Sequence, residues 1–173
     1  MPAPSVSDQR HAANAYRFHS IHPALRVGTA SDRYAGWIGQ IYPEEAYGPQ
    51  IDRRSKTVGG ERFSVRKVPI DSVQHYFVHF GVLEIDFTFY RPLLEADGER
   101  SNTYRTLAAY AEHAPPDAAF LVKAPQMYTA RTLHRGGSYI TNETYLDADG
   151  YQQRFEAPLV DILGDRLAGV ILQ

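Results

Sequence analysis

The stretch from Val82 to Asp86 limits the fold most, because it places two carboxylates on one side of an otherwise apolar strand. Side chains alternate across a β-strand, so Leu83 and Ile85 form an apolar face while Glu84 and Asp86 point the opposite way. Desolvating an isolated carboxylate costs several kcal/mol. The pattern therefore predicts a strand whose apolar face packs on helices and whose other face meets a cation, a metal or a hydrated cavity.

The length and composition predict a single globular domain, because 173 residues that are 43% hydrophobic can bury one core. Residues 1–20 are rich in Ala, Ser, Pro and His and lack an apolar core, so we expect a flexible N-terminal arm. Residues 21–173 are expected to form the domain.

The absence of cysteine excludes disulfides, thiolate nucleophiles and cysteine-ligated metals. No stretch approaches the ~18 apolar residues of a membrane span, and no signal peptide is recognisable. We therefore expect a cytoplasmic protein without a membrane partner. The net charge of −2 gives no global attraction to nucleic acid, so such a partner is disfavoured unless it meets a local patch.

Strand-like and helix-like segments alternate along the chain, which predicts a parallel sheet with its strands in chain order. The expected strands cover residues 25–30, 82–87, 118–124 and 167–172, and the expected helices follow Asp71, Ser101 and Phe155. Asp71 and Ser101 are expected to act as N-caps, and the third helix to bend near Pro158. The turn-rich segments 31–69 and 125–154 are expected to be long loops.

The last expected strand is apolar and would lie at an unpaired edge of the sheet. Four strand and helix units are half of an eight-stranded TIM barrel. We therefore expect a partial α/β TIM-barrel domain, completed by a missing half-barrel or by self-association.

The stretches Glu84 to Tyr90, Phe120 to Ala124, Gly28 to Ala30 and Trp37 to Gly39 carry motifs that make the chain resemble a known family. The resemblance is to the N-terminal half of the YecE-like proteins, a family of TIM-barrel proteins that forms domain of unknown function seventy-two. The family's Glu-x-Asn-x-Thr-Phe-Tyr motif is similar to residues 84–90, and its Phe-x-Val-Lys-Ala motif is similar to residues 120–124. Its Gly-Thr-Ser and Trp-x-Gly motifs resemble residues 28–30 and 37–39. The likeness runs from about Leu25 to the end and implies a TIM barrel without a settled reaction. Asp86 replaces the family's Asn, and Thr129-Ala130 replaces its usual Thr-His.

The predicted site combines Glu84, Asp86 and Lys123, since parallel strands bring their carboxyl ends to one face, where TIM-barrel sites lie. Lys123 could hold the acids ionised or act as an electrophile while one carboxylate transfers a proton. Arg26, Trp37, Tyr90 and Arg91 are predicted to bind a small polar or phosphorylated compound. An enzyme built on this site would be a hydrolase, lyase or isomerase. The sequence does not decide whether the protein is an enzyme.

Other interpretations of the same residues stay open. Glu84, Asp86 and Lys123 could be a structural ion-pair network, or the two acids could hold a divalent metal, for which no further ligands are evident. No metal is therefore assigned, and the sequence names no cofactor. His75 and His79 have metal-ligand spacing, but they lie opposite the apolar stripe of their helix and are expected to face solvent.

The segment from Arg53 to Lys67 supports a second functional hypothesis. It carries Arg53, Arg54, Lys56, Arg62, Arg66 and Lys67, and it contains the flexible pair Gly59-Gly60. Such a segment can bind an anion or a nucleic-acid backbone, although a charge run is more often a solvated loop. The alternative to an enzyme is therefore a non-catalytic module that binds anions or nucleic acid, or an inactive fragment that needs the missing half-barrel.

Overall fold

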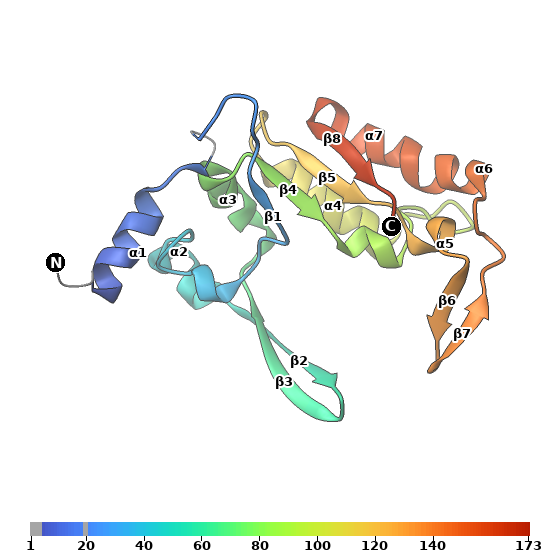
Figure 1. The fold of residues 1–173 in the computed structure, drawn as a ribbon, viewed down its shortest axis with the longest axis horizontal. Helices are drawn as coiled ribbons and strands as arrows, with labels where there is room; N and C mark the ends of the chain where they lie inside the picture. The colour runs from blue at the N-terminus through green and yellow to red at the C-terminus, as the bar shows by residue number, and fades with distance from the viewer. Residues whose placement is uncertain (1–4, 19–20) are drawn as a thin grey trace.

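The computed structural model, which describes residues 5–18 and 21–173, is an α/β fold built on a four-stranded parallel sheet (Figure 1). The strand order is β1-β4-β5-β8, so each strand lies beside the next sheet strand of the chain. The sheet strands are β1 (Gly28–Ala30), β4 (Val82–Ile85), β5 (Phe120–Lys123) and β8 (Leu167–Ile171). The prediction of a parallel sheet in chain order is confirmed.

Helices occupy all three connections within the sheet. The α-helices are α1 (Val6–Ala15), α2 (Glu44–Tyr47), α3 (Val73–His79), α4 (Asn102–His113), α5 (Gln126–Thr129), α6 (Ala148–Tyr151) and α7 (Ala157–Leu163). Short 3₁₀ turns are η2 (Ala35–Trp37), η3 (Gly48–Gln50), η4 (Ile70–Ser72), η5 (Phe87–Tyr90) and η7 (Gly164–Arg166). A π-helical turn, η6 (Gln152–Glu156), joins α6 to α7.

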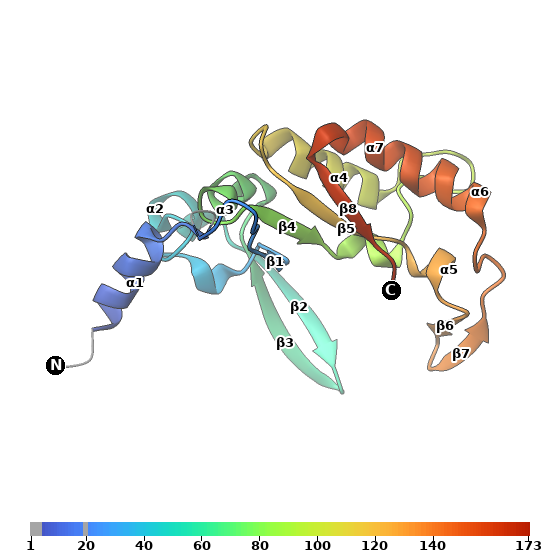
Figure 2. The ribbon, with the colours of Figure 1, turned by 45° about the horizontal axis from the view of Figure 1, so that its top comes forward.

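One face of the sheet is buried under helices and the other is open. Leu83, Ile85, Phe120 and Val122 are at most 2% exposed, whereas their alternating neighbours are only half-buried. Figures 1 and 2 show α3, α4 and α7 along the same side of the sheet. Parallel sheets are usually covered on both faces. Within the described residues, the second cover is absent, so the open face remains available to another chain or domain.

The close approach of β1 to β4 depends on Gly28. A Cβ atom at this position would overlap the carbonyl oxygen of Val82, which is the backbone partner of Gly28 in the parallel ladder. The observed strand is shorter than expected, since Leu25, Arg26 and Val27 lie before its first residue. The glycine therefore allows the first strand to join the sheet.

The two predicted helix caps have different outcomes. Ser101 caps α4 as predicted, since its hydroxyl accepts a hydrogen bond from the Tyr104 amide at 3.1 Å. Asp71 is not a cap: it lies inside η4, and the structure shows no side-chain cap at the start of α3. The turn begins earlier, after Pro69, which occupies its N-cap position with an extended backbone.

The two segments expected to be long loops each contain a β-hairpin. Strands β2 (Asp52–Val58) and β3 (Glu61–Lys67) pair antiparallel, as do β6 (Thr132–Arg135) and β7 (Ser138–Thr141). A Gly-Gly pair with positive φ forms each turn, at residues 59–60 and 136–137. The hairpins replace the loops because these glycines permit tight turns between strands of equal length.

The segment expected to be a flexible arm contains α1, and its following residues contact α3. Phe18 stacks on Phe80 with ring centroids 4.7 Å apart, and the ring Nδ1 of His79 lies 2.8 Å from the Tyr16 carbonyl oxygen. The prediction that His75 and His79 face solvent is wrong. His79 is 2% exposed, and the half-buried His75 lies 2.9 Å from the Tyr47 hydroxyl. Both are covered by chain segments that lie far from α3 in sequence.

No helix in residues 5–18 and 21–173 is both long and apolar enough to cross a lipid bilayer.

Candidate functional site

Glu84 and Lys123 form an ion pair on the open face of the sheet. The register places Glu84 beside Leu121 and therefore two positions from Lys123, so both side chains leave the same face. Lys123 Nζ lies 3.2 Å from Glu84 Oε1, and about a quarter of each side chain is exposed. The structure thus brings together two of the three residues predicted to form the central site.

Asp86 differs from the prediction because β4 ends at Ile85. Its backbone is helical, with φ −96° and ψ −24°, and its carbonyl oxygen accepts a hydrogen bond from the Phe89 amide. Asp86 therefore starts the turn η5 and does not continue the alternation of Val82 and Glu84. It stands at the carboxyl end of the strand, where a turn replaces the pleat.

A polar cavity of 320 Å³ lies beside the carboxyl ends of β4 and β5. Three segments build it: η5 with the residues that follow, α5 with β6, and the π-helical turn η6. Its charged and polar lining comprises Tyr90, Arg91, Glu95, Gln126, His134, Arg135 and Arg154. We call this the β4/β5 pocket. It contains two of the predicted ligand-binding residues, Tyr90 and Arg91, and it is large enough for a small metabolite.

Pro158 explains how η6 holds one wall of this pocket. In an α-helix the carbonyl of Arg154 would accept the amide of residue 158, but proline has no N–H. The Arg154 carbonyl instead accepts the backbone amides of Leu93 and Leu94 at 3.1 and 3.0 Å. Arg154 Nε also donates to the Leu94 carbonyl at 3.2 Å. The loop after β4 is therefore fixed against the π-helical turn.

The β4/β5 pocket carries an excess of positive charge. Arg91 is paired with Glu95 at 2.8 Å, and Glu95 is the one carboxylate that lines the cavity. Arg135 and Arg154 add two further guanidinium groups. Guanidinium groups bind phosphate and carboxylate through pairs of parallel hydrogen bonds. The pocket can therefore accept an anionic group, with the exposed ring of Tyr90 at its rim.

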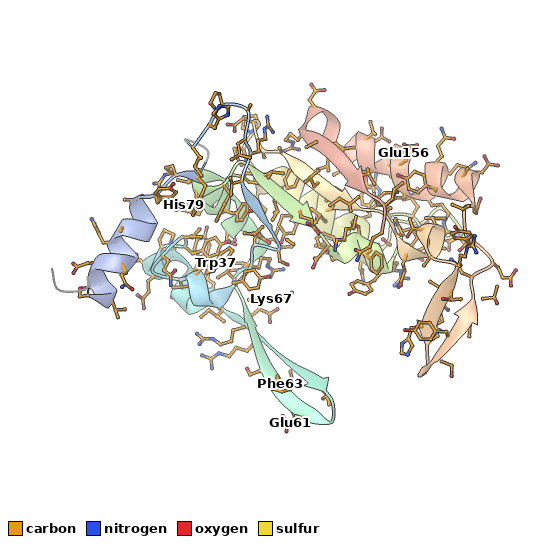
Figure 3. All side chains as sticks on the ribbon, in the orientation of Figure 1. Trp37, Glu61, Phe63, Lys67, His79 and Glu156 are labelled. Carbon is orange, nitrogen blue, oxygen red and sulfur yellow. The ribbon has the colours of Figure 1, made fainter. Side chains whose placement is uncertain are left out.

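The remaining predicted ligand-binding residues lie elsewhere. Arg26 is exposed and precedes β1, at the amino edge of the sheet. Trp37 lies in η2 (Figure 3) and lines another cavity with Tyr34 and Arg66. Neither residue lines the β4/β5 pocket. The structure divides the predicted set into the ion pair, the pocket pair, Asp86 at the start of η5, and these two outlying residues.

The sequence analysis did not identify Asp32, a buried carboxylate two residues after the end of β1. It is 3% exposed, and its Oδ1 accepts a hydrogen bond from the Tyr110 hydroxyl at 2.7 Å. Among the described residues, its Oδ2 has no hydrogen-bond partner. Burial raises the pKa of Asp32 to about 6, against the opposing effects of the Tyr110 hydrogen bond and the Arg33 charge. Nothing in an aspartate beside a strand marks it as buried, because Tyr110 is distant in sequence.

The side chains that could bind a metal do not converge. In the described part of the chain, no three His, Asp or Glu side chains are grouped as a metal site would require. Glu84 is paired with Lys123.

Comparisons of the chain with models of known families, with curated proteins and with solved structures found no match.

Proposed function

We propose that this protein binds a small phosphorylated compound in the β4/β5 pocket and acts on it at the carboxyl edge of the sheet. The observation that carries the proposal is the convergence of Arg91, Arg135 and Arg154 on one cavity. Because Glu95 neutralises only one of these charges, a phosphate monoester would supply the missing negative charge. A polar lining and a volume of 320 Å³ favour a small ligand over a macromolecule.

The ion pair provides the reactive groups of this proposal. Lys123 can polarise a carbonyl or phosphoryl oxygen, while the Glu84 carboxylate can transfer a proton. Gln126, which lines the pocket, follows Lys123 by three residues, so the ion pair and the pocket share the carboxyl end of β5. This arrangement supports a hydrolase, lyase or isomerase. The binding of the phosphorylated compound is the first step to test.

The sheet supports the further proposal that the domain is part of a YecE-like TIM barrel. Four parallel strands in chain order, with helices on one face, correspond to half of such a barrel. A second half-barrel or a second copy of the chain would then cover the open face. Sedimentation velocity of the purified chain would show a concentration-dependent dimer if a second copy has this role, and a monomer at all concentrations would contradict it.

Isothermal titration with glycerol 3-phosphate tests the proposed binding, with glycerol as the unphosphorylated control. We expect saturable binding of the phosphate ester alone. Substitutions Arg91→Gln and Arg135→Gln should each weaken it by about tenfold, since a hydrogen bond to a charged group contributes about 1.5 kcal/mol.

Arg105→Gln is the matched control, because Arg105 is an exposed residue of α4 outside the pocket and contacts Asn102. This variant should bind like the unmodified protein. Equal binding of glycerol and its phosphate ester, or unchanged affinity in both pocket variants, would refute the proposal. Loss of turnover of the bound compound in Glu84→Gln and Lys123→Met, with its affinity retained, would then separate the catalytic role of the ion pair from binding by the pocket.

A further inference from the structure

We infer that the hairpin β2–β3 and the aromatic pair Tyr34 and Trp37 form a binding site for single-stranded nucleic acid. This site is separate from the β4/β5 pocket, and the inference does not depend on the function proposed above. Figures 1 and 2 both show the hairpin projecting beyond the sheet and its helices. Its strands are therefore open to a partner along most of their length.

The antiparallel register sorts the side chains of the hairpin by charge. Alternation and cross-strand pairing place six residues on one face: Arg53, Ser55 and Thr57 of β2, opposite Arg66, Ser64 and Arg62 of β3. We call this the arginine face. Every member is exposed, and none is acidic or apolar.

Both acids of the hairpin belong to the opposite face. Asp52 lies opposite Lys67 in the ladder, and Glu61 lies in β3 on the same face as Phe63 and Lys67 (Figure 3). The side chains of Arg54 and Lys56, which the sequence analysis included in the basic segment, lie outside the described residues. The register therefore places both acids of the hairpin on the face opposite the arginine face.

The arginine face also contains a direct pair of like charges. Arg53 lies opposite Arg66 in the ladder, and like charges in this position destabilise a sheet. A bound phosphate would convert that repulsion into attraction. The hydroxyls of Ser55, Ser64 and Thr57 can donate further hydrogen bonds to phosphate oxygens, as such side chains do in nucleic-acid complexes.

An aromatic site continues the arginine face at the base of the hairpin. A cavity of 540 Å³ is lined by Arg66 and Ser64 on one side and by Tyr34 and Trp37 on the other. Tyr34 is 48% exposed, its ring centroid lies 4.9 Å from that of Trp37, and its backbone bridges to Lys67. An unpaired base can stack in this cavity while its backbone follows the arginines.

The combination of arginine side chains, hydroxyl groups and aromatic rings identifies the class of ligand. Proteins that bind single strands without sequence preference join a positively charged track to aromatic rings on which bases stack. A paired base in a duplex would not present its face to Tyr34. A surface that only attracts counter-ions would need neither the hydroxyl groups nor the aromatic rings of this site. The chemistry therefore favours a single-stranded DNA or RNA over a duplex or a lipid surface.

The chain offers a site-specific reporter, because Trp37 is its only tryptophan. Fluorescein-labelled 15-mers of deoxythymidine and of uridine would be titrated and followed by anisotropy, and unlabelled 15-mers by Trp37 emission. We expect binding together with quenching of Trp37, and the two oligonucleotides would distinguish DNA from RNA. Three phosphate contacts give a slope of about −2 in log K against log salt, so affinity should fall about 20-fold between 50 and 200 mM salt.

Two sets of variants test the two parts of the site. The double substitution Arg62→Gln and Arg66→Gln should reduce the salt slope to about −0.7. Lys67→Gln removes the same kind of charge from the opposite face of β3 and should leave Trp37 quenching intact. Tyr34→Leu should weaken binding by at least about fivefold through lost stacking, whereas Tyr34→Phe should retain it.

Several results would overturn the inference. Affinity retained in the double arginine variant would exclude the arginine face. Binding without any change in Trp37 emission, or equal affinity for a 15-base-pair duplex, would exclude stacking of an unpaired base. Tighter binding to phosphatidylserine vesicles than to either oligonucleotide would identify a lipid surface in its place.

Discussion

The buried carboxylate of Asp32 should make the stability of this protein fall as pH rises. An ordinary aspartate has a pKa of 3.8, and burial raises that of Asp32 to about 6. Below pH 3.8 both the folded and the unfolded states hold the proton, so the group has no effect. Between these values the unfolded state releases its proton while the folded state keeps it, which favours unfolding. Above pH 6 both states are ionised, so the whole loss of stability caused by Asp32 remains.

The size of this effect follows from the two pKa values. Each pH unit of difference corresponds to about 1.4 kcal/mol, so the folded state should lose about 3 kcal/mol between pH 3.5 and pH 7.5 through this group. The substitution Asp32→Asn removes the titration while keeping an oxygen that can accept the hydrogen bond of Tyr110. The variant should therefore gain about 3 kcal/mol relative to the unmodified protein over the same range.

Urea unfolding, followed by circular dichroism at a series of pH values, measures this difference. Taking the difference between the two proteins cancels the titration of the other carboxylates and histidines. A second variant, Tyr110→Phe, removes a hydrogen bond that stabilises the ionised carboxylate of Asp32. It should therefore raise the pKa of Asp32 further, so that the loss of stability continues to above pH 6. A constant difference between Asp32→Asn and the unmodified protein from pH 3.5 to 7.5 would refute the argument.

Three further predictions concern the sheet and the cap of α4. Gly28→Ala should lower the free energy of unfolding by about 3 kcal/mol or more, because the added Cβ would overlap the neighbouring strand. Gly169→Ala, whose added Cβ would have its nearest contact at 3.4 Å, should lower it much less, and the midpoints of urea unfolding compare the two variants. Ser101→Ala should lose about 1 kcal/mol through its cap, and retained stability would exclude that role. Lys123→Met should cost less than about 1 kcal/mol, since its ion pair with Glu84 is partly exposed, and a much larger loss would show a structural pair.

The sequence predicts the sheet well because its signal is local. Alternating apolar residues mark β4 and β5, and helical stripes between them require parallel strands joined by crossovers. The hairpins were missed although each has a two-residue Gly-Gly turn between segments of equal length. In β2 and β3 the alternating residues are charged, so the pattern resembled a solvated loop.

The candidate site is less predictable, because its parts come from distant segments. Glu84 and Lys123 follow from strand alternation, and Tyr90 and Arg91 from their place after β4. Arg154 joins them only through η6, some sixty residues later in the chain. Pro158 is the available sequence signal, since it frees the Arg154 carbonyl that holds the loop, but it cannot indicate which segment donates hydrogen bonds to that carbonyl. Asp86 was misplaced because nothing in the alternation marks the end of the strand.

The crystal structure of this protein soaked with glycerol 3-phosphate tests the central claim most directly. The account predicts electron density for a phosphate group in the β4/β5 pocket, with guanidinium nitrogens of Arg91 and Arg135 within hydrogen-bonding distance of its oxygens. An empty pocket in crystals where the ligand is bound elsewhere, such as beside Tyr34 and Arg66, would contradict it.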